Sequence, residues 1–133
     1  MDGHNDTLFK YELLGGMARA MLADTKALTQ TARDVHGLSQ VGTAAMGRLL
    51  TATAMMASDL KSAGDSLTAR VEGGGPLGLL LAVGKPDGTV KGYVESPAAE
   101  LPSANGKLPV GAAVDNAGML TVIKDLGLKE PYV

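Results

Sequence analysis

Cysteine and tryptophan are absent from this sequence, and aromatic residues are scarce. The 133-residue chain contains no cysteine, no tryptophan, three tyrosines and one phenylalanine. Without cysteine it has no disulfide, no thiol nucleophile and no zinc-thiolate site. Four aromatic rings are too few to build a stacking platform for single-stranded nucleic acid. These absences exclude thiol redox chemistry by the chain itself and weigh against a nucleic-acid partner.

The sequence also lacks an excess of either charge and an uninterrupted hydrophobic run. Twelve basic and fourteen acidic side chains give a net charge of −2, so the electrostatic footprint of phosphate-backbone binding is missing. The main apolar stretch, residues 41–57, carries Arg48 near its middle, and a charge is costly in lipid. The polar first residues do not resemble a signal peptide. We expect neither nucleic acid nor a membrane as partner, and a cytoplasmic location is compatible with these features.

The period of the hydrophobic pattern predicts an α+β fold made mostly of antiparallel hairpins. Apolar residues make up 45% of the chain and charged residues 20%, which suits one globular domain. Segments of alternating or continuous apolar character predict strands, and apolar residues at helical spacing predict helices. The predicted strands are residues 8–14, 17–23, 67–72, 79–83, 90–95 and 119–123, and the predicted helices are residues 26–36 and 40 to about 61.

The first two strands form a predicted hairpin. Phe9, Tyr11 and Leu13 alternate with charged residues and therefore share one face. The Gly15-Gly16 pair can adopt positive φ at both positions, so a two-residue turn is expected between the strands. A second hairpin, with its turn at Lys85–Gly88, is expected between the later strands 79–83 and 90–95.

The long second helix is predicted to be buried against a sheet. Ser39 is placed to cap its N-terminus, and its polar positions are few and small. Gly42 and Gly47 lower its helix propensity by about 1 kcal/mol each. We interpret these glycines as sites where a neighbouring backbone approaches closely.

Two further segments give specific expectations about the sheet. Residues 79–83 are apolar without alternation, which predicts a central strand covered on both faces. Residues 131–133 have the composition of a strand that begins but has nothing left to pair with. We therefore expect the chain to stop inside a domain.

Few residues could carry chemistry. The run Gly73–Gly78 is the nearest approach to a phosphate-binding loop, but it joins two strands and lacks the lysine and hydroxyl residue that would follow. A structural turn is the favoured interpretation, and a small anion- or ligand-binding module is the alternative. His4 and His36 lack a partner carboxylate at ligand spacing, and His36 suits a helix C-terminus. Met46, Met55 and Met56 are interpreted as core.

The sequence contains no set of residues in a pattern typical of an enzyme active site. The aspartates stand at predicted caps and turns, and no serine lies in a nucleophile-elbow motif. We therefore predict no catalytic, cofactor-binding or metal-binding residues and a protein that is not an enzyme. Leu79, Leu81 and Val83 would be candidates for binding another protein only if their strand were uncovered, and ordinary core is the favoured interpretation.

Six segments in the same order resemble the redox-regulated heat-shock chaperonins of bacteria, the HslO family. Each segment alone is weak, but together they span nearly the whole chain, and the last is the most specific. They are ARAMLADT (18–25), TAAMGRLLTATAMMASDLK (43–61), LTARVEGGGPLG (67–78), GYVESPAAELP (92–102), GKLPVGAAV (106–114) and LTVIKDLGLKEPYV (120–133).

The resemblance implies an ATP-independent holdase in the cytoplasm that binds unfolded proteins under oxidative and heat stress. It implies layered sheets (β/β/α) with a long buried helix, and a homodimer as the assembly, with domain swapping as an open alternative. Residues 1–133 would be a truncated N-terminal domain for client binding and dimerisation. The client-binding residues are not assigned.

In the family, a C-terminal domain binds zinc through four cysteines in C-x-C and C-x-x-C pairs, and their oxidation exposes the client surface. None of these cysteines has a matching position here, so no zinc and no other cofactor is expected in this chain. An inert structural fragment that only pairs with its missing half is a third possibility, because missing strands leave sheet edges open to swapped dimers or aggregation.

The absence of cysteine generates the first prediction. The purified chain should contain no zinc, and peroxide should not change its binding to an unfolded client. Metal analysis and client binding before and after peroxide, with methionine oxidation excluded by mass spectrometry, test this. A peroxide-induced change in binding would refute it.

Overall fold

Four antiparallel strands form the main sheet of the computed structural model, which describes residues 5–133. The strand order is β5-β4-β3-β6, so β3 and β4 are central. The register places Ala69 opposite both Ala82 and Val122, and directly paired residues point to the same face. The four strands are β3 (Ser66–Glu72), β4 (Leu80–Gly84), β5 (Val90–Val94) and β6 (Met119–Asp125).

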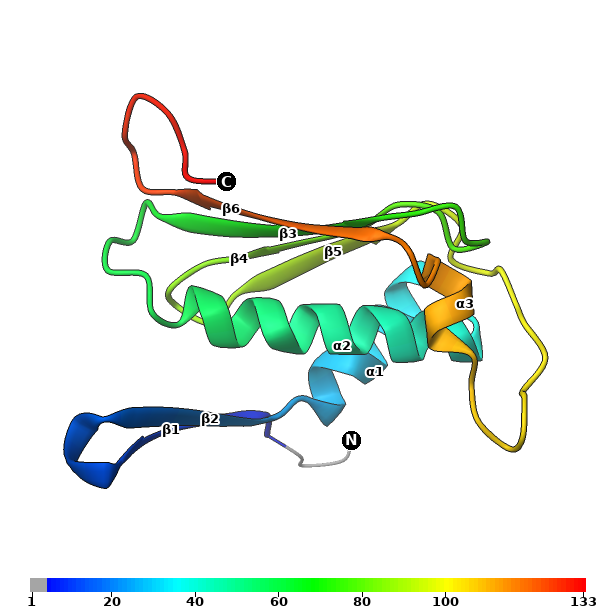
Figure 1. Cartoon of the computed structure of the whole chain (residues 1–133), viewed down its shortest axis with the longest axis horizontal. Coiled ribbons are helices and arrows are strands. Elements are labelled where there is room, and N and C mark those ends of the chain that lie inside the picture. The colour runs from blue at the N-terminus through cyan, green and yellow to red at the C-terminus, as the bar shows by residue number, and fades with distance from the viewer. Residues whose placement is uncertain (1–4) are drawn as a thin grey trace.

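The long helix α2 (Gln40–Ala57) covers one face of this sheet (Figure 1). Met46 is fully buried at this interface, and its Cε occupies the place that a Cβ on Gly92 of β5 would take. Leu67 and Leu80 lie in the same buried layer. The prediction that the helix is buried against a sheet is therefore confirmed, although the helix ends at Ala57 rather than near residue 61.

The N-terminus of α2 is capped as predicted. The Ser39 hydroxyl accepts a hydrogen bond from the amide of Gly42 (3.0 Å) and donates one to the carbonyl of Ala99 (2.6 Å). Gly42 also lies against the carbonyl of Pro97, and Gly47 lies against Thr29. The expected close approach of a backbone is therefore present at Gly42, whereas the neighbour at Gly47 is a side chain. These two contacts bring a loop and another helix onto α2.

The helix that packs on α2 is α1 (Lys26–His36), which ends at Gly37 with a left-handed φ of 62°. Thr25 makes no side-chain cap, although Asp24 accepts a bond from the Lys26 amide at 3.3 Å. Asp6 accepts shorter bonds from the amides of Ala27 and Leu28, at 2.8 and 2.6 Å. Sequence reasoning missed this cap because the chain distance between Asp6 and the helix gives no local signal.

The strands β1 (Thr7–Leu13) and β2 (Ala18–Asp24) form a separate hairpin on the side of α2 opposite the sheet (Figure 1). Their connection is the short 3-10 turn η1 (Leu14–Gly16) followed by Met17, so four residues link strands that were expected to be joined by two. Leu14, Gly15 and Gly16 all have positive φ. Leu14 thus adopts a left-handed backbone conformation that glycine adopts far more readily than leucine.

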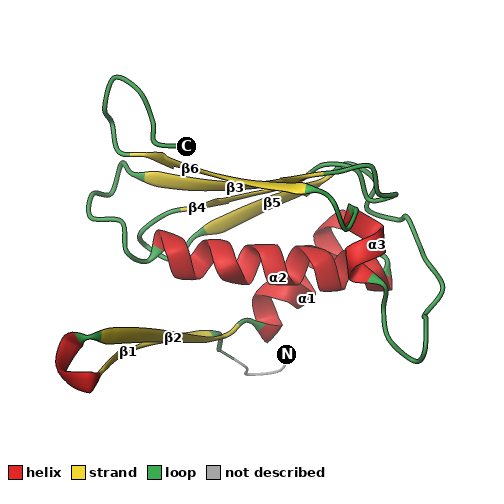
Figure 2. Cartoon of the chain, viewed as in Figure 1, coloured by secondary structure: helices red, strands yellow, loops and turns green. Residues whose placement is uncertain are grey.

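The α+β class, the antiparallel hairpins and the long buried helix are confirmed (Figure 2). The expected layer order needs one refinement, because the helices lie between the four-stranded sheet and the hairpin. The expectation that residues 79–83 are covered on both faces is wrong. Leu80 and Ala82 are buried under α2, whereas Leu81 and Val83 on the other face are only half-buried.

The C-terminal part differs from expectation in two places. A short helix α3 (Val110–Val114) was not predicted; it packs on α2 and against the glycine run. Residues 131–133 are not unpaired, because Tyr132 exchanges two backbone hydrogen bonds with Lys124 of β6, at 2.8 and 2.9 Å. No helix within residues 5–133 is long and apolar enough to cross a membrane.

The cap of α2 generates the second prediction. Ser39→Ala removes the cap and leaves the Ala99 carbonyl without its donor, so it should lower the free energy of unfolding by about 1–2 kcal/mol. Urea unfolding followed by circular dichroism measures this. Ser103→Ala is the matched control, because Ser103 is exposed in the loop between β5 and α3. It should change stability little.

Candidate functional site

The outer face of the β1–β2 hairpin is apolar and open to solvent. Its register places Phe9 opposite Leu22 and Tyr11 opposite Ala20, so these side chains share one face. Phe9, Tyr11 and Leu22 are 50%, 47% and 61% exposed. The two rings lie with their centroids 6.3 Å apart. We call Phe9, Tyr11, Leu13 and Leu22 the hairpin face.

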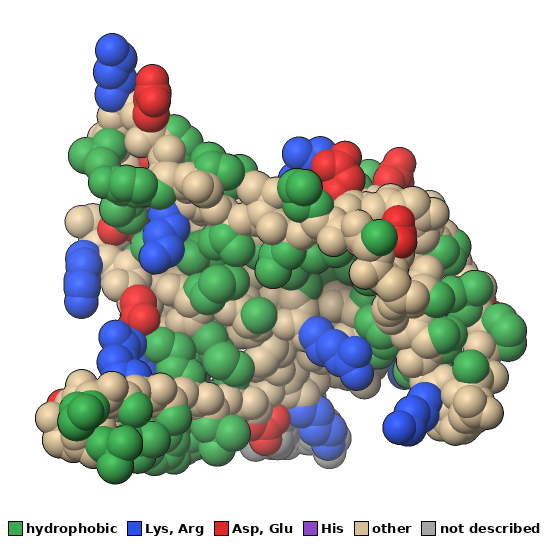
Figure 3. Space-filling view, viewed as in Figure 1, with side chains coloured by type: hydrophobic (Ala, Val, Ile, Leu, Met, Phe, Trp, Pro, Cys, Tyr) green, Lys and Arg blue, Asp and Glu red, His purple; other side chains and the backbone are tan. Residues whose placement is uncertain are grey.

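The hairpin face continues onto the turn at the hairpin tip. Leu14 and Met17 are 77% and 86% exposed, and Figure 3 shows hydrophobic side chains gathered along the hairpin. Single exposed apolar residues need no explanation, but a contiguous apolar group on a projecting element is typical of a surface that binds another molecule. The sequence predicted the shared face of Phe9 and Tyr11, but not its exposure.

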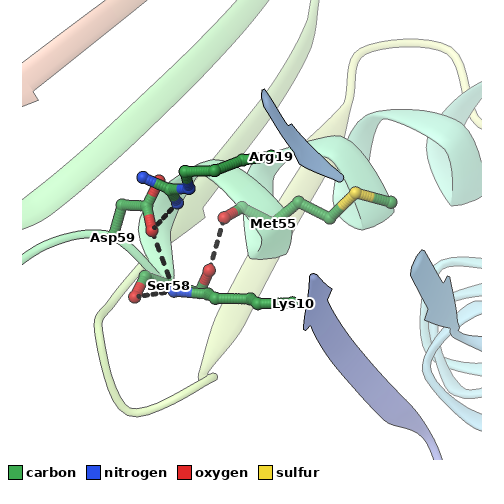
Figure 4. A network of polar contacts seen from close by, with 5 residues as sticks. All are labelled: Lys10, Arg19, Met55, Ser58 and Asp59. Carbon is green, nitrogen blue, oxygen red and sulfur yellow. Dashed lines mark hydrogen bonds and ion pairs between the residues drawn. The ribbon is translucent and has the colours of Figure 1, made fainter. Parts of the chain in front are cut away.

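The opposite face of the hairpin is attached to the C-terminal end of α2 by polar contacts (Figure 4). Asp59 receives two bonds from the Arg19 guanidinium, both 2.9 Å, and one from the Lys10 ammonium at 2.8 Å. Lys10 also donates to the carbonyl of Ser58 at 2.8 Å. These charged residues turn toward α2, which directs the hairpin face to solvent. We call Lys10, Arg19 and Asp59 the hairpin anchor.

The electrostatics of the hairpin anchor centre on one carboxylate. The hydrogen bond from Lys10 lowers the pKa of Asp59, burial opposes this, and the bond from Arg19 adds to the lowering. The Asp59 side chain is 43% exposed, so each ion pair contributes at most about 1 kcal/mol. The hairpin is therefore held in place by modest forces rather than by a large buried contact.

The uncovered face of the main sheet is a second, weaker candidate. Leu81 and Val83, which the sequence analysis named with Leu79, lie there with half-buried side chains. Tyr93 of β5 is 50% exposed beside Leu81 in the register. Arg70 and its 3.0 Å ion pair with Glu72 interrupt the apolar surface. This face of the sheet therefore carries both apolar and charged side chains and is less uniformly apolar than the hairpin face.

The Gly73–Gly78 run is a packing turn and does not support the anion-binding alternative. The Gly74 amide donates to the carboxylate of Asp115 at 2.9 Å, and the Leu79 amide donates to Glu95 at 2.8 Å. A Cβ at Gly75 would collide with the backbone of Ala113. Hydrogen bonds from Ala117 and Gly74 lower the pKa of Asp115. Carboxylates therefore occupy the amides of Gly74 and Leu79, which disfavours binding of an anion there.

The histidines do not come together in a site. His36 lies at the end of α1, as expected, but it is half-buried rather than solvent-exposed. His4 lies outside the described residues. Within residues 5–133 no group of three or more histidine, aspartate or glutamate side chains could hold a metal ion. Met46 is fully buried as predicted, whereas Met55 and Met56 are half-buried.

These features define a class of protein: an α+β domain with an apolar hairpin face held out from its helical layer. The family model described as Hsp33 protein matches residues 6–133. The chain belongs to the Hsp33 family. The expected family is therefore confirmed.

Individual relatives agree with this assignment. The 33 kDa chaperonin of Alkaliphilus metalliredigens is 52% identical over 116 residues, which are 86% of this chain and 40% of that protein. The 33 kDa chaperonin of Clostridium tetani is 45% identical over 129 residues, covering 96% of this chain and 44% of that protein. This chain thus spans well under half the length of these relatives.

A solved structure supports the fold as well. The crystal structure of the 33 kDa chaperonin of Thermotoga maritima, a heat shock protein 33 homologue, is 32% identical with a TM-score of 0.88. The match covers 94% of this chain and 43% of that chain. The similarity therefore includes the sheet, the helical layer and nearly all of the chain.

The hairpin anchor generates the third prediction. Asp59→Asn should weaken the attachment of the hairpin by about 1 kcal/mol or less, seen as faster hydrogen exchange of β1 and β2 amides at pH 7. In the unchanged protein the attachment should persist above the ordinary aspartate pKa of about 3.9 and fade as pH falls through the lowered pKa of Asp59.

The control for this prediction is Asp87→Asn. The hydrogen bond from the amide of Thr89 lowers the pKa of Asp87 in the turn between β4 and β5. Asp87 does not contact the β1–β2 hairpin. Equal exchange of β1 and β2 amides in the Asp59 and Asp87 variants would contradict the anchoring role.

Proposed function

We propose that this chain is an ATP-independent holdase that binds unfolded proteins through the hairpin face. The exposed apolar group of Phe9, Tyr11 and Leu22 is the observation that carries the proposal. The names of its relatives, 33 kDa chaperonins, support a chaperone function. A holdase needs accessible apolar surface and no catalytic group, so we also propose that the chain acts without an enzymatic reaction.

The binding energy of one hairpin face is small. Full burial of a large apolar side chain contributes about 1.5–3 kcal/mol, and the three residues are already half covered, so together they offer about 3–4 kcal/mol. That corresponds to affinity weaker than about 1 mM. Two hairpin faces in one assembly would gain avidity without new contacts. This arithmetic supports a homodimer, domain-swapped or not, as the working form.

We further propose residues 1–133 as the N-terminal client-binding and dimerisation part of a cytoplasmic protein of oxidative and heat stress. The chain lacks the cysteines of the zinc redox switch that the resemblance implies. Regulation by zinc would then belong to the parts of the longer relatives that this chain does not match.

The fourth prediction tests the hairpin face directly. Phe9→Ser with Leu22→Ser removes two of its four apolar side chains and should lower suppression of client aggregation at least severalfold, because the binding energy is roughly halved. Light scattering of a heat-denatured model protein at increasing chaperone ratios measures this. Unchanged suppression would refute the role of the hairpin face.

The control is Val35→Ser on α1, where the valine is 72% exposed and lies outside the hairpin face. It removes one exposed apolar side chain outside the hairpin face and should leave suppression unchanged. If the unaltered chain fails to slow aggregation even in excess, the holdase proposal itself fails.

A further inference from the structure

A groove of about 700 Å³ lies between α1 and α2, on a side of α2 that the sheet does not cover. Thr29 and Arg33 of α1 line one wall, and Gly47 of α2 lies at its base, where its missing Cβ allows contact with Thr29. Leu108, from the loop before α3, also lines it and is 37% exposed. Neither the hairpin face nor the glycine run contributes to this groove.

The groove has an apolar surface. The hydroxyls of Thr25 and Thr51 bond each other at 2.6 Å, and Thr51 also donates to the carbonyl of Gly47 at 2.7 Å. Both hydroxyl protons are thus used within the protein, and these residues offer mainly apolar contact. Met55 and Leu108 add larger apolar side chains. An occupant must therefore bury apolar groups here.

The charge of the groove is positive. Arg33 and Arg48 both line it and are exposed, and in residues 5–133 neither guanidinium makes a hydrogen bond or ion pair. Among the lining residues that the structure describes there is no carboxylate; Asp24 and Glu100 each share a neighbouring hollow with Arg33. Two unpaired cations stand out in a chain of net charge −2. The complementary occupant is acidic.

The shape of the groove favours a helical segment. Its lining extends along α2 from Gln40 to Met55, a separation that spans about 22 Å at 1.5 Å per residue, or about four helical turns. Small residues such as Ala44 and Gly47 let another helix approach closely. Helix-in-groove recognition uses an apolar stripe with polar residues at its margins, which matches this lining.

We propose that this groove binds acidic amphipathic helical segments of client proteins. Acidic side chains of the segment pair with Arg33 and Arg48, and its apolar stripe lies against Met55 and Leu108. The inference names a class of client segment and so rests on the proposed function. It adds a site that selects by charge, whereas the hairpin face selects only for apolar character.

The fifth prediction uses two fluorescein-labelled 18-residue amphipathic peptides with the same leucine and alanine stripe. One carries glutamates beside the stripe and the other carries lysines. Fluorescence anisotropy with the full chain should show the glutamate peptide binding at least tenfold more tightly at low salt. Raising salt to about 0.5 M should reduce the preference, because exposed charges are screened.

The variants assign the preference to the groove. Arg33→Gln with Arg48→Gln should weaken glutamate-peptide binding about tenfold, whereas Arg33→Lys with Arg48→Lys should retain most of it. Lys85→Gln with Lys91→Gln, at exposed lysines of the β4–β5 hairpin, removes equal charge elsewhere and should have no effect. Equal binding of the two peptides, or equal loss in the Arg33/Arg48 and Lys85/Lys91 glutamine variants, would overturn the proposal.

Parallel light scattering separates the two proposals. If the chain suppresses aggregation but does not discriminate between the peptides, the groove proposal fails and the holdase function stands. If the glutamate peptide binds with the expected dependence on Arg33 and Arg48 but aggregation is not suppressed, the holdase proposal fails and the groove remains a peptide-binding site.

Discussion

The packing of α2 on the four-stranded sheet is the interaction on which the rest of the structure depends. Met46 fills the space opened by Gly92, and Leu67 and Leu80 complete the buried layer beneath the helix. Protein interiors are packed so closely that such a layer has few alternative arrangements. Once α2 is placed, Gly42 and Gly47 bring the Pro97 loop and α1 against other parts of its surface.

The same packing explains why apolar surface remains exposed. One long helix covers one face of one sheet, and the hairpin contacts mainly the C-terminal end of α2 through Lys10, Arg19 and Asp59. Polar attachment on one side of a two-stranded ribbon leaves the other side to solvent. The apolar hairpin face and the cationic groove beside α1 are thus both consequences of how little of α2 and the hairpin the chain can cover.

Particular elements show how far sequence reasoning reached. The strand around Ala69 and the cap at Ser39 were predicted because alternation and capping are local signals. The Asp6 cap of α1 and the partner of Tyr132 were missed because both depend on residues distant in the chain. The half-covered strand at Leu81 was misjudged because an apolar run does not reveal whether a second layer lies above it.

The sequence by itself determined the α+β class, the order of the strands and of the two longer helices, the absence of thiol chemistry and the family resemblance, since composition, period and motif order are properties of the chain alone. Only the tertiary structure decided which apolar residues face solvent. Phe9 and Leu80 are both strand residues in apolar patterns, yet Phe9 is 50% exposed and Leu80 is 1% exposed. The difference arises because α2 packs against β4, while the hairpin turns its charged side toward α2.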